Sequence, residues 1–197
     1  MIEDVAGASA ADSLLDLVWS TSRHVALLAA WVATCGSLFF SEVLGWPPCE
    51  LCWFQRILMY PLAVILAVAI LRRDEGVHLY VLPFSVVGIG VSLYHHLLIK
   101  TNWFPPPSCS SGVPCNVDFL NWFGFITIPF LALIAFVIIT LAMLVWAFLQ
   151  PPDAEPDDEA PVEHAPAPRP GLGADRLAVP MIVVLVVLAF MVLSTFV

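Results

Sequence analysis

The chain has 197 residues, of which 60% are hydrophobic and 12% are charged, and its net charge is -9. A soluble globular chain is about half apolar and about a quarter charged, so this composition predicts a membrane protein. The sequence holds no cluster of basic residues, which argues against nucleic acid as a partner.

The apolar residues fall into five blocks, each near the ~20 residues that a helix needs to cross a bilayer. These blocks cover residues 24–44, 53–71, 79–99, 123–149 and 177–197. The alternating short segments of a membrane β-barrel are absent from the sequence. We therefore expect an all-α membrane protein: a four-helix transmembrane bundle over residues 24–149 and a fifth, C-terminal transmembrane helix over residues 177–197.

Two segments lie outside these helices. Residues 1–23 lack the basic start of a signal peptide, and their pattern suits a short interfacial helix or a frayed terminus equally. Residues 150–176 are rich in proline and hold nearly half of the 16 acidic residues. Such a composition predicts a cytoplasmic linker without a packed core, whose acidity serves solvation.

The basic residues predict the orientation in the membrane. Five arginines fall on one side of the predicted helices, namely Arg23, Arg72, Arg73, Arg169 and Arg176. The other side has Lys100 alone, leaving aside Arg56, which lies within the second helix. Because positive residues favour the cytoplasm, we expect the amino terminus to be cytoplasmic. The loops 45–52 and 100–122 then face outward.

Four of the five cysteines lie in these two outward loops, where disulfides persist and can be exchanged. Cys49 and Cys52 form a Cys-x-x-Cys pair directly before an apolar helix. That placement puts Cys52 at or near a helix amino terminus, which favours a thiolate. Arg56 follows one turn later on the same face and could stabilise the thiolate or bind a ligand carbonyl; the alternative is a plain snorkelling arginine.

The fifth cysteine, Cys35, lies in the middle of the first predicted helix among small residues, and we assign it no chemistry.

Cys109 and Cys115 form a second pair in the other outward loop. An isolated pair outside the cytoplasm is a structural staple by default, whereas a short, exposed disulfide is of the kind that exchanges. A zinc centre built from both pairs is a third reading. The five residues between Cys109 and Cys115 and the oxidising side of the membrane argue against zinc, so we expect no metal.

Three strings carry a resemblance to a known family: CELCWFQRILMYPL at 49–62, CSSGVPC at 109–115 and FITIPFLAL at 125–133. They resemble the bacterial DsbB family of membrane disulfide oxidoreductases, and within it the shorter-loop, BdbC-like members. The likeness covers roughly residues 24–149. It implies a multi-pass protein of the bacterial cell membrane that reoxidises a DsbA-like, thioredoxin-fold partner and passes electrons to a quinone, either ubiquinone or menaquinone.

The resemblance also implies roles for individual residues. Cys109 would be attacked by the partner thiolate, with Cys115 as its disulfide partner. Cys49 would relay the electrons, and Cys52 would lie next to the quinone with Arg56 as a quinone contact.

A histidine near the outer end of the third helix belongs to the quinone site of this family. His95 and His96 are both candidates, and alignment favours His95. The alternative for either is a polar residue that satisfies a neighbouring helix. Ser85, Gly88 and Ser92 form a stripe of small residues that predicts the packed face of this helix.

Two features depart from the family. Family members often carry Gln four residues after this histidine, where the chain has Ile99. The fifth apolar block lies beyond the usual bundle, and its uniform Val, Leu and Ile content favours a plain membrane anchor.

Three other classes compete with this assignment. Enzymes similar to vitamin K epoxide reductase carry the loop pair before the Cys-x-x-Cys pair, the reverse of the order here. A reductive carrier needs cysteines across the membrane, for which Cys35 alone does not suffice. A non-enzymatic protein with stapled loops would leave the arrangement of Cys52 and Arg56 unexplained.

Overall fold

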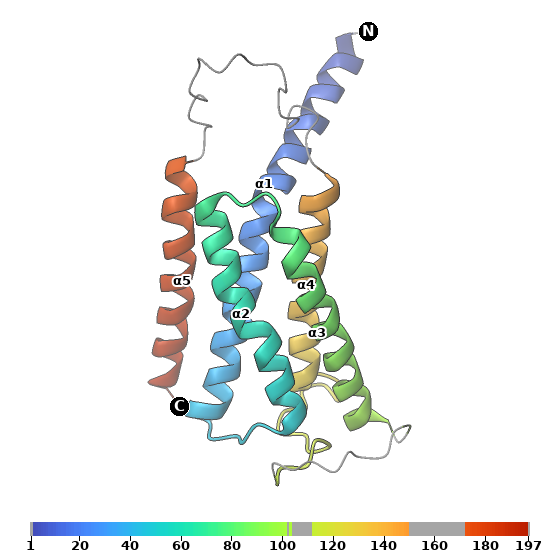
Figure 1. Ribbon diagram of the computed structural model, residues 1–197, viewed down its shortest axis with the longest axis vertical. Helices are drawn as coiled ribbons and strands as arrows, with labels where there is room; N and C mark the ends of the chain where they lie inside the picture. The colour runs from blue at the N-terminus through green and yellow to red at the C-terminus, as the bar shows by residue number, and fades with distance from the viewer. Residues whose placement is uncertain (1, 102, 104–111, 150–171, 197) are drawn as a thin grey trace.

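The computed structural model describes residues 2–101, 103, 112–149 and 172–196, so Cys109 and most of the acidic linker lie outside the described residues. The helices are α1 (Ile2–Leu38), α2 (Glu50–Arg72), α3 (Val77–Lys100), α4 (Ile128–Phe148) and α5 (Leu172–Ser194), and a π-helical turn, η1 (Phe39–Val43), extends α1 (Figure 1). Among the described residues, five helices are long and apolar enough to span a membrane. The predicted fold class is confirmed.

Helices α1 to α4 form a bundle in which α1 and α3 each contact both α2 and α4, and α5 lies outside against α1 and α2. The centre of the bundle is filled by large apolar side chains without solvent exposure, among them Leu27, Leu66, Phe136 and Ile139. Figure 1 shows that the α1–α2 connection and the start of α4 lie at the same end of the bundle. The two cysteine-bearing loops therefore meet at one end.

Small residues let α3 and α4 approach each other closely. Ser85, Gly88 and Ser92 are all buried, which confirms the predicted packed face. A Cβ atom added to Gly88 would lie 2.4 Å from the ring of Phe136. A hydrogen bond also joins the two helices: the hydroxyl of Thr140 in α4 donates to Ser85 Oγ in α3 at 2.9 Å.

The start of α4 differs from the predicted block 123–149. Phe123 and Gly124 have positive φ angles of 53° and 80°, and Trp122 pairs with Ile126 in an isolated β-bridge. Thr127 then caps the helix, which begins at Ile128 with Pro129 in its first turn, where a missing N–H costs nothing. The helix is therefore shorter than the apolar block, because residues 123–127 form a tight turn before the cap.

The first helix runs without interruption from Ile2, so helical structure continues through the segment for which we weighed an interfacial helix against a frayed end. Trp19 stacks on Trp146 of α4 with ring centroids 4.1 Å apart, and its Nε1 donates to the carbonyl of Trp146 at 3.2 Å. The candidate membrane span within this element is Leu17–Val43.

Helix α5 packs against the bundle at both of its ends. Near its start, Asp175 Oδ1 lies 3.4 Å from His24 Nε2 of α1. Near its end, the ring of Phe190 meets the ring of Phe39 edge-on, with centroids 6.0 Å apart, and lies beside Gly36 of α1.

Candidate thiol–disulfide site

The Cys-x-x-Cys pair is shaped by the start of α2. Cys49 is the N-cap of this helix, with φ -74° and ψ 174°, and Cys52 is the third residue of the helix. The sulfur of Cys49 accepts a hydrogen bond from the backbone N–H of Cys52 at 3.4 Å, and the two sulfur atoms lie 3.0 Å apart. Cys49 therefore takes the capping position that serine or aspartate often fills.

The second cysteine pair is represented among the described residues by Cys115. This residue is disulfide-bonded and 2% exposed, whereas Cys49 and Cys52 are free thiols and Cys49 is 5% exposed. Cys49, Cys115 and Leu98 share one small buried cluster. A thiol pair and a disulfide are thus in contact at one end of the bundle.

His95 connects the two cysteine centres. Its Nε2 lies 3.0 Å from the main-chain oxygen of Cys115 and 3.7 Å from Cys49 Sγ. Its Nδ1 lies 3.3 Å from Gln55 Nε2 of α2. Since a carbonyl oxygen only accepts, the Nε2–H donates to Cys115, and Nδ1 accepts from the amide of Gln55. His95 is 2% exposed.

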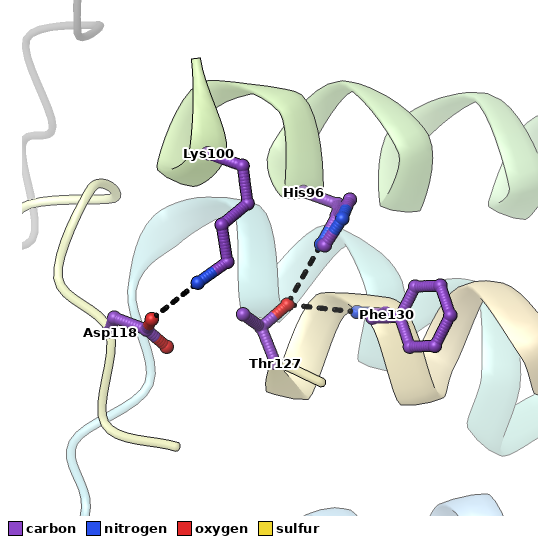
Figure 2. A network of polar contacts seen from close by, with 5 residues as sticks. All are labelled: His96, Lys100, Asp118, Thr127 and Phe130. Atoms are coloured by element: carbon purple, nitrogen blue, oxygen red, sulfur yellow. Dashed lines mark hydrogen bonds and ion pairs between the residues drawn. The ribbon is translucent and has the colours of Figure 1, made fainter. Parts of the chain in front are cut away.

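His96 faces a different part of the fold. Its Nδ1 lies 2.9 Å from Thr127 Oγ1, and its ring lies 5.2 Å from that of Phe130 (Figure 2). Thr127 Oγ1 also accepts the backbone N–H of Phe130 as the N-cap of α4. The structure therefore separates the two adjacent histidines, which the sequence could not, and places His95 at the cysteines.

An ion pair holds the loop that follows Cys115. Lys100 Nζ at the end of α3 donates to Asp118 Oδ2 at 3.0 Å (Figure 2). Both side chains are about a fifth exposed, so the pair contributes no more than about 1 kcal/mol and serves to position the loop.

Arg56 lies one turn after Cys52 and contacts α1. Its Nη2 donates to the main-chain oxygen of Ser37 at 3.1 Å, and its guanidinium lies 5.3 Å from the ring centre of Trp53. Ser37 is two residues before the π-helical turn η1, a type of irregularity that is frequent at functional sites. A charged group within a membrane helix is thereby given a partner.

The electrostatics of the site favour a thiolate on Cys49. The hydrogen bond with the Cys52 sulfur lowers the pKa of Cys49, and His95 and the backbone N–H of Cys52 act in the same direction, against burial, which raises it. We expected the helix amino terminus to act on Cys52. In the structure, Cys49 is the N-cap of α2, and its sulfur receives the contacts from Cys52 and His95.

A small pocket lies beside the cysteines. Its volume is about 20 Å³, and its lining includes Cys49, Cys52, His95, Ile99 and Asp118. A cavity of this size holds about one water molecule and is far too small for a quinone ring. Beside the start of α2, Trp53 and Ile57 are exposed, and Arg56 carries further N–H groups besides the one bonded to Ser37.

Sequence reasoning missed two residues of this site. Gln55 is a buried polar residue in a membrane helix, and its place one turn after Cys52 is a signal that would have identified it. Asp118 gave no such signal, because its contact with Lys100 depends on how the loop folds back.

These observations define a multi-pass helical membrane protein with a thiol pair and a disulfide in contact at one end. The sequence profile described as "Disulfide bond formation protein DsbB" matches residues 20–147. The chain therefore belongs to the DsbB family, which implies disulfide oxidoreductase activity. Helix α5 lies beyond the matched residues.

Several bacterial disulfide formation proteins are similar to this chain. Disulfide bond formation protein C of Bacillus subtilis is 52% identical over 127 residues, which are 62% of this chain and 92% of that protein. A probable disulfide formation protein C of Halalkalibacterium halodurans is 50% identical over 119 residues, 59% of this chain and 86% of that protein. A probable disulfide formation protein C of Bacillus cereus is 46% identical over 122 residues, 59% of this chain and 88% of that protein. No solved structure matches the chain.

Proposed function

We propose that this chain is a quinone-dependent oxidoreductase that forms disulfides by reoxidising a DsbA-like, thioredoxin-fold partner outside the cytoplasm. The observation that carries the proposal is the bridge made by His95, which contacts both Cys49 of one centre and Cys115 of the other. Electrons can pass between two cysteine pairs by disulfide exchange only where their sulfurs can approach.

In the proposed cycle, a partner thiolate attacks Cys109 and Cys115 leaves as a thiolate. The second partner thiol resolves the mixed disulfide, so the partner is oxidised and the Cys109–Cys115 pair is reduced. A thiolate of that pair then attacks Cys49 of the Cys49–Cys52 disulfide, which forms a mixed disulfide and expels Cys52 as a thiolate. The other thiol of the loop pair attacks this mixed disulfide, which restores the Cys109–Cys115 disulfide and releases Cys49 as a thiolate.

The residues suited to hold a quinone are Cys52 and Arg56. A bound quinone would supply a two-electron, two-proton acceptor for the reduced pair. Arg56 would offer an N–H donor to a carbonyl oxygen in addition to its bond to Ser37. His95, which the resemblance assigns to the quinone site, is almost fully buried between the cysteine centres, so we assign it a positioning role there.

The proposed orientation places the cysteine loops outside the cytoplasm. Arg23, Arg72 and Arg176 lie at the opposite end of the helices from Lys100, in line with the preference of positive residues for the cytoplasm. A membrane-impermeant thiol reagent added to intact cells after reduction should therefore reach the cysteine loops, and labelling only after lysis would overturn the orientation.

An activity assay tests the chemistry. The detergent-solubilised protein is mixed with a quinone and a reduced thioredoxin-fold protein, and quinone absorbance is followed. Cys52→Ala should abolish quinone reduction, whereas Cys35→Ala, which removes a free thiol in the last turn of α1, should leave it unchanged. Quinone reduction by Cys52→Ala at the wild-type rate would show that the proposed mechanism is wrong.

A further inference from the structure

Three atoms that can ligate a metal ion converge at the start of α2. The sulfur atoms of Cys49 and Cys52 and a ring nitrogen of His95 all lie within 4.8 Å of one another. They come from two helices, and Cys49 and His95 are almost completely shielded from solvent. We propose that the reduced Cys49–Cys52 pair and His95 form a binding site for a thiophilic divalent cation such as Zn²⁺. This site goes beyond the proposed oxidoreductase function and does not depend on it.

The distances suit tetrahedral coordination after a small adjustment. With Zn–S bonds of about 2.3 Å and Zn–N bonds of about 2.0 Å, tetrahedral ligands lie about 3.8 Å apart for two sulfurs and about 3.5 Å apart for sulfur and nitrogen. Cys49 Sγ and His95 Nε2 are already 3.7 Å apart. The two sulfurs, at 3.0 Å, need to separate by less than about 1 Å, which a modest rotation of either side chain provides.

The pocket beside these residues can supply the fourth ligand. It is lined by all three ligands and has a volume of about 20 Å³, enough for one water molecule. Two cysteines, one histidine and a water molecule form a known type of zinc site with an exchangeable position. Asp118 also lines the pocket and can accept a hydrogen bond from that water.

Binding of the cation requires a change at His95. Its Nε2–H donates to the carbonyl of Cys115, so coordination through Nε2 moves the proton to Nδ1 and breaks that bond. Gln55 can then present its amide oxygen to Nδ1–H, an arrangement that typically orients a metal-bound histidine. The cation thus competes with the contact that holds Cys115 beside the thiol pair.

The redox state of the pair controls the site. Coordination needs two thiolates, so binding releases the thiol protons, and a Cys49–Cys52 disulfide leaves only His95 as a ligand. We expected no metal from the sequence because we considered a site built from both loop pairs. The site proposed here uses one pair and a histidine from another helix, a combination that requires the fold.

The test uses the full chain in detergent, with Co²⁺ as a spectroscopic probe and Zn²⁺ as competitor. Cys109→Ser/Cys115→Ser serves as background, so that the Cys-x-x-Cys pair and Cys35 are the only thiols after reduction. The reduced protein should bind one Co²⁺ per chain with a sulfur-to-cobalt charge-transfer band, and Zn²⁺ should displace it. The disulfide form should bind none. No quinone or partner is present, so the result is independent of the proposed activity.

His95→Gln should weaken Co²⁺ binding at least tenfold, whereas His96→Gln, its matched control on the same helix, should not change it. Cys35→Ser should bind as tightly as the background protein. His95→Cys should restore binding with a stronger charge-transfer band, because a third thiolate replaces the imidazole; this variant decides the matter if His95→Gln fails to fold. Three results would overturn the proposal. A folded His95→Gln protein could bind Co²⁺ as tightly as the background protein, or the disulfide form could bind Co²⁺ as well as the reduced form. The Co²⁺ spectrum of His95→Cys could also be the same as that of the background protein.

Discussion

His95 Nε2 lies 3.0 Å from the main-chain oxygen of Cys115, a residue that follows it by 20 positions and belongs to the other cysteine centre. The same nitrogen lies 3.7 Å from Cys49 Sγ. One buried imidazole therefore fixes the distance between the thiol pair and the loop that carries the disulfide. The position of this ring in turn depends on Gln55, which donates to the other ring nitrogen.

Gln55→Met should impair the contact between the two cysteine centres. The substitution preserves size but removes the N–H that holds Nδ1 of His95 as an acceptor, so the ring is no longer fixed with its Nε2–H toward Cys115. A buried group left without its partner costs about 1–3 kcal/mol. We expect a lower melting temperature in detergent and an approximately tenfold slower exchange between the two cysteine pairs, the factor that corresponds to about 1.4 kcal/mol in a barrier.

Ile57→Met, two residues further on the exposed face of α2, is the matched control and should change neither quantity. Exchange can be followed by rapid thiol trapping after reduction of the loop disulfide. Wild-type exchange rates in Gln55→Met would show that Gln55 has no positioning role.

The lowered pKa of Cys49 predicts a shallow pH dependence of the reduction potential of the Cys49–Cys52 pair. Because its pKa is lowered, Cys49 loses its proton at a lower pH than an ordinary thiol and is a thiolate at neutral pH. Reduction of the disulfide at neutral pH therefore takes up one proton, on Cys52, for every two electrons. The potential should therefore fall by about 30 mV per pH unit, against about 60 mV for a pair that binds two protons. The measurement is equilibration with glutathione buffers between about pH 6 and 8, the range in which ordinary thiols are protonated.

His95→Gln removes one of the contacts that lower the pKa of Cys49, so its slope should steepen toward the two-proton value. A chelator is included in every sample to keep metal from the thiols. A slope near 60 mV in the wild-type protein would show that Cys49 keeps its proton across this range.

The sequence predicted the helical architecture because membrane-spanning helices carry a strong, local signal in length and hydropathy. It predicted that the two cysteine loops lie at the same end of the bundle and that the small residues around Gly88 form a packed face. The residues near Cys49 indicated the family. The break before α4 escaped detection because Phe123 and Ile126 are apolar and read as helix, whereas the turn is made by backbone angles and the Thr127 cap.

The site itself was predicted in composition but not in geometry. His95 and His96 lie at adjacent positions, and a small difference in helix rotation decides which of them reaches the cysteines. The contact of Arg56 with the Ser37 carbonyl depends on the packing of α1 on α2, on which a single helix gives no information. Long-range contacts between polar groups are set by the fold, and hydropathy does not encode them.

Thr127→Ala should destabilise the start of α4. The hydroxyl of Thr127 accepts the N–H of Phe130 and lies in hydrogen-bond contact with His96 Nδ1 at 2.9 Å, and the residue has no solvent exposure (Figure 2). Loss of an N-cap costs about 0.5–2 kcal/mol, and the half-buried imidazole of His96 also loses its hydrogen-bond partner. Thr127→Ser retains both bonds and should melt within a few degrees of the wild type, so equal melting temperatures for the Ala and Ser variants would contradict the assigned cap.

Gly88→Ala should destabilise the bundle, and Gly90→Ala should not. Both glycines lie in α3, but a Cβ atom at position 88 would lie 2.4 Å from the Phe136 ring, whereas position 90 has nothing within 4 Å. Phe136 is fully buried between the helices and cannot retreat without moving its neighbours, so α3 and α4 must separate. Overpacking of this kind costs about 1–3 kcal/mol.

The paired variants remove the effect of helix propensity, because alanine replaces glycine within the same helix in both. Thermal unfolding in detergent, followed by far-ultraviolet circular dichroism, should show a lower melting temperature for Gly88→Ala alone. Separation of α3 from α4 would also move His95 relative to Cys49, so the same variant should slow exchange between the cysteine pairs. If Gly88→Ala and Gly90→Ala melted together, the close approach of α3 and α4 at Phe136 would not exist in the protein.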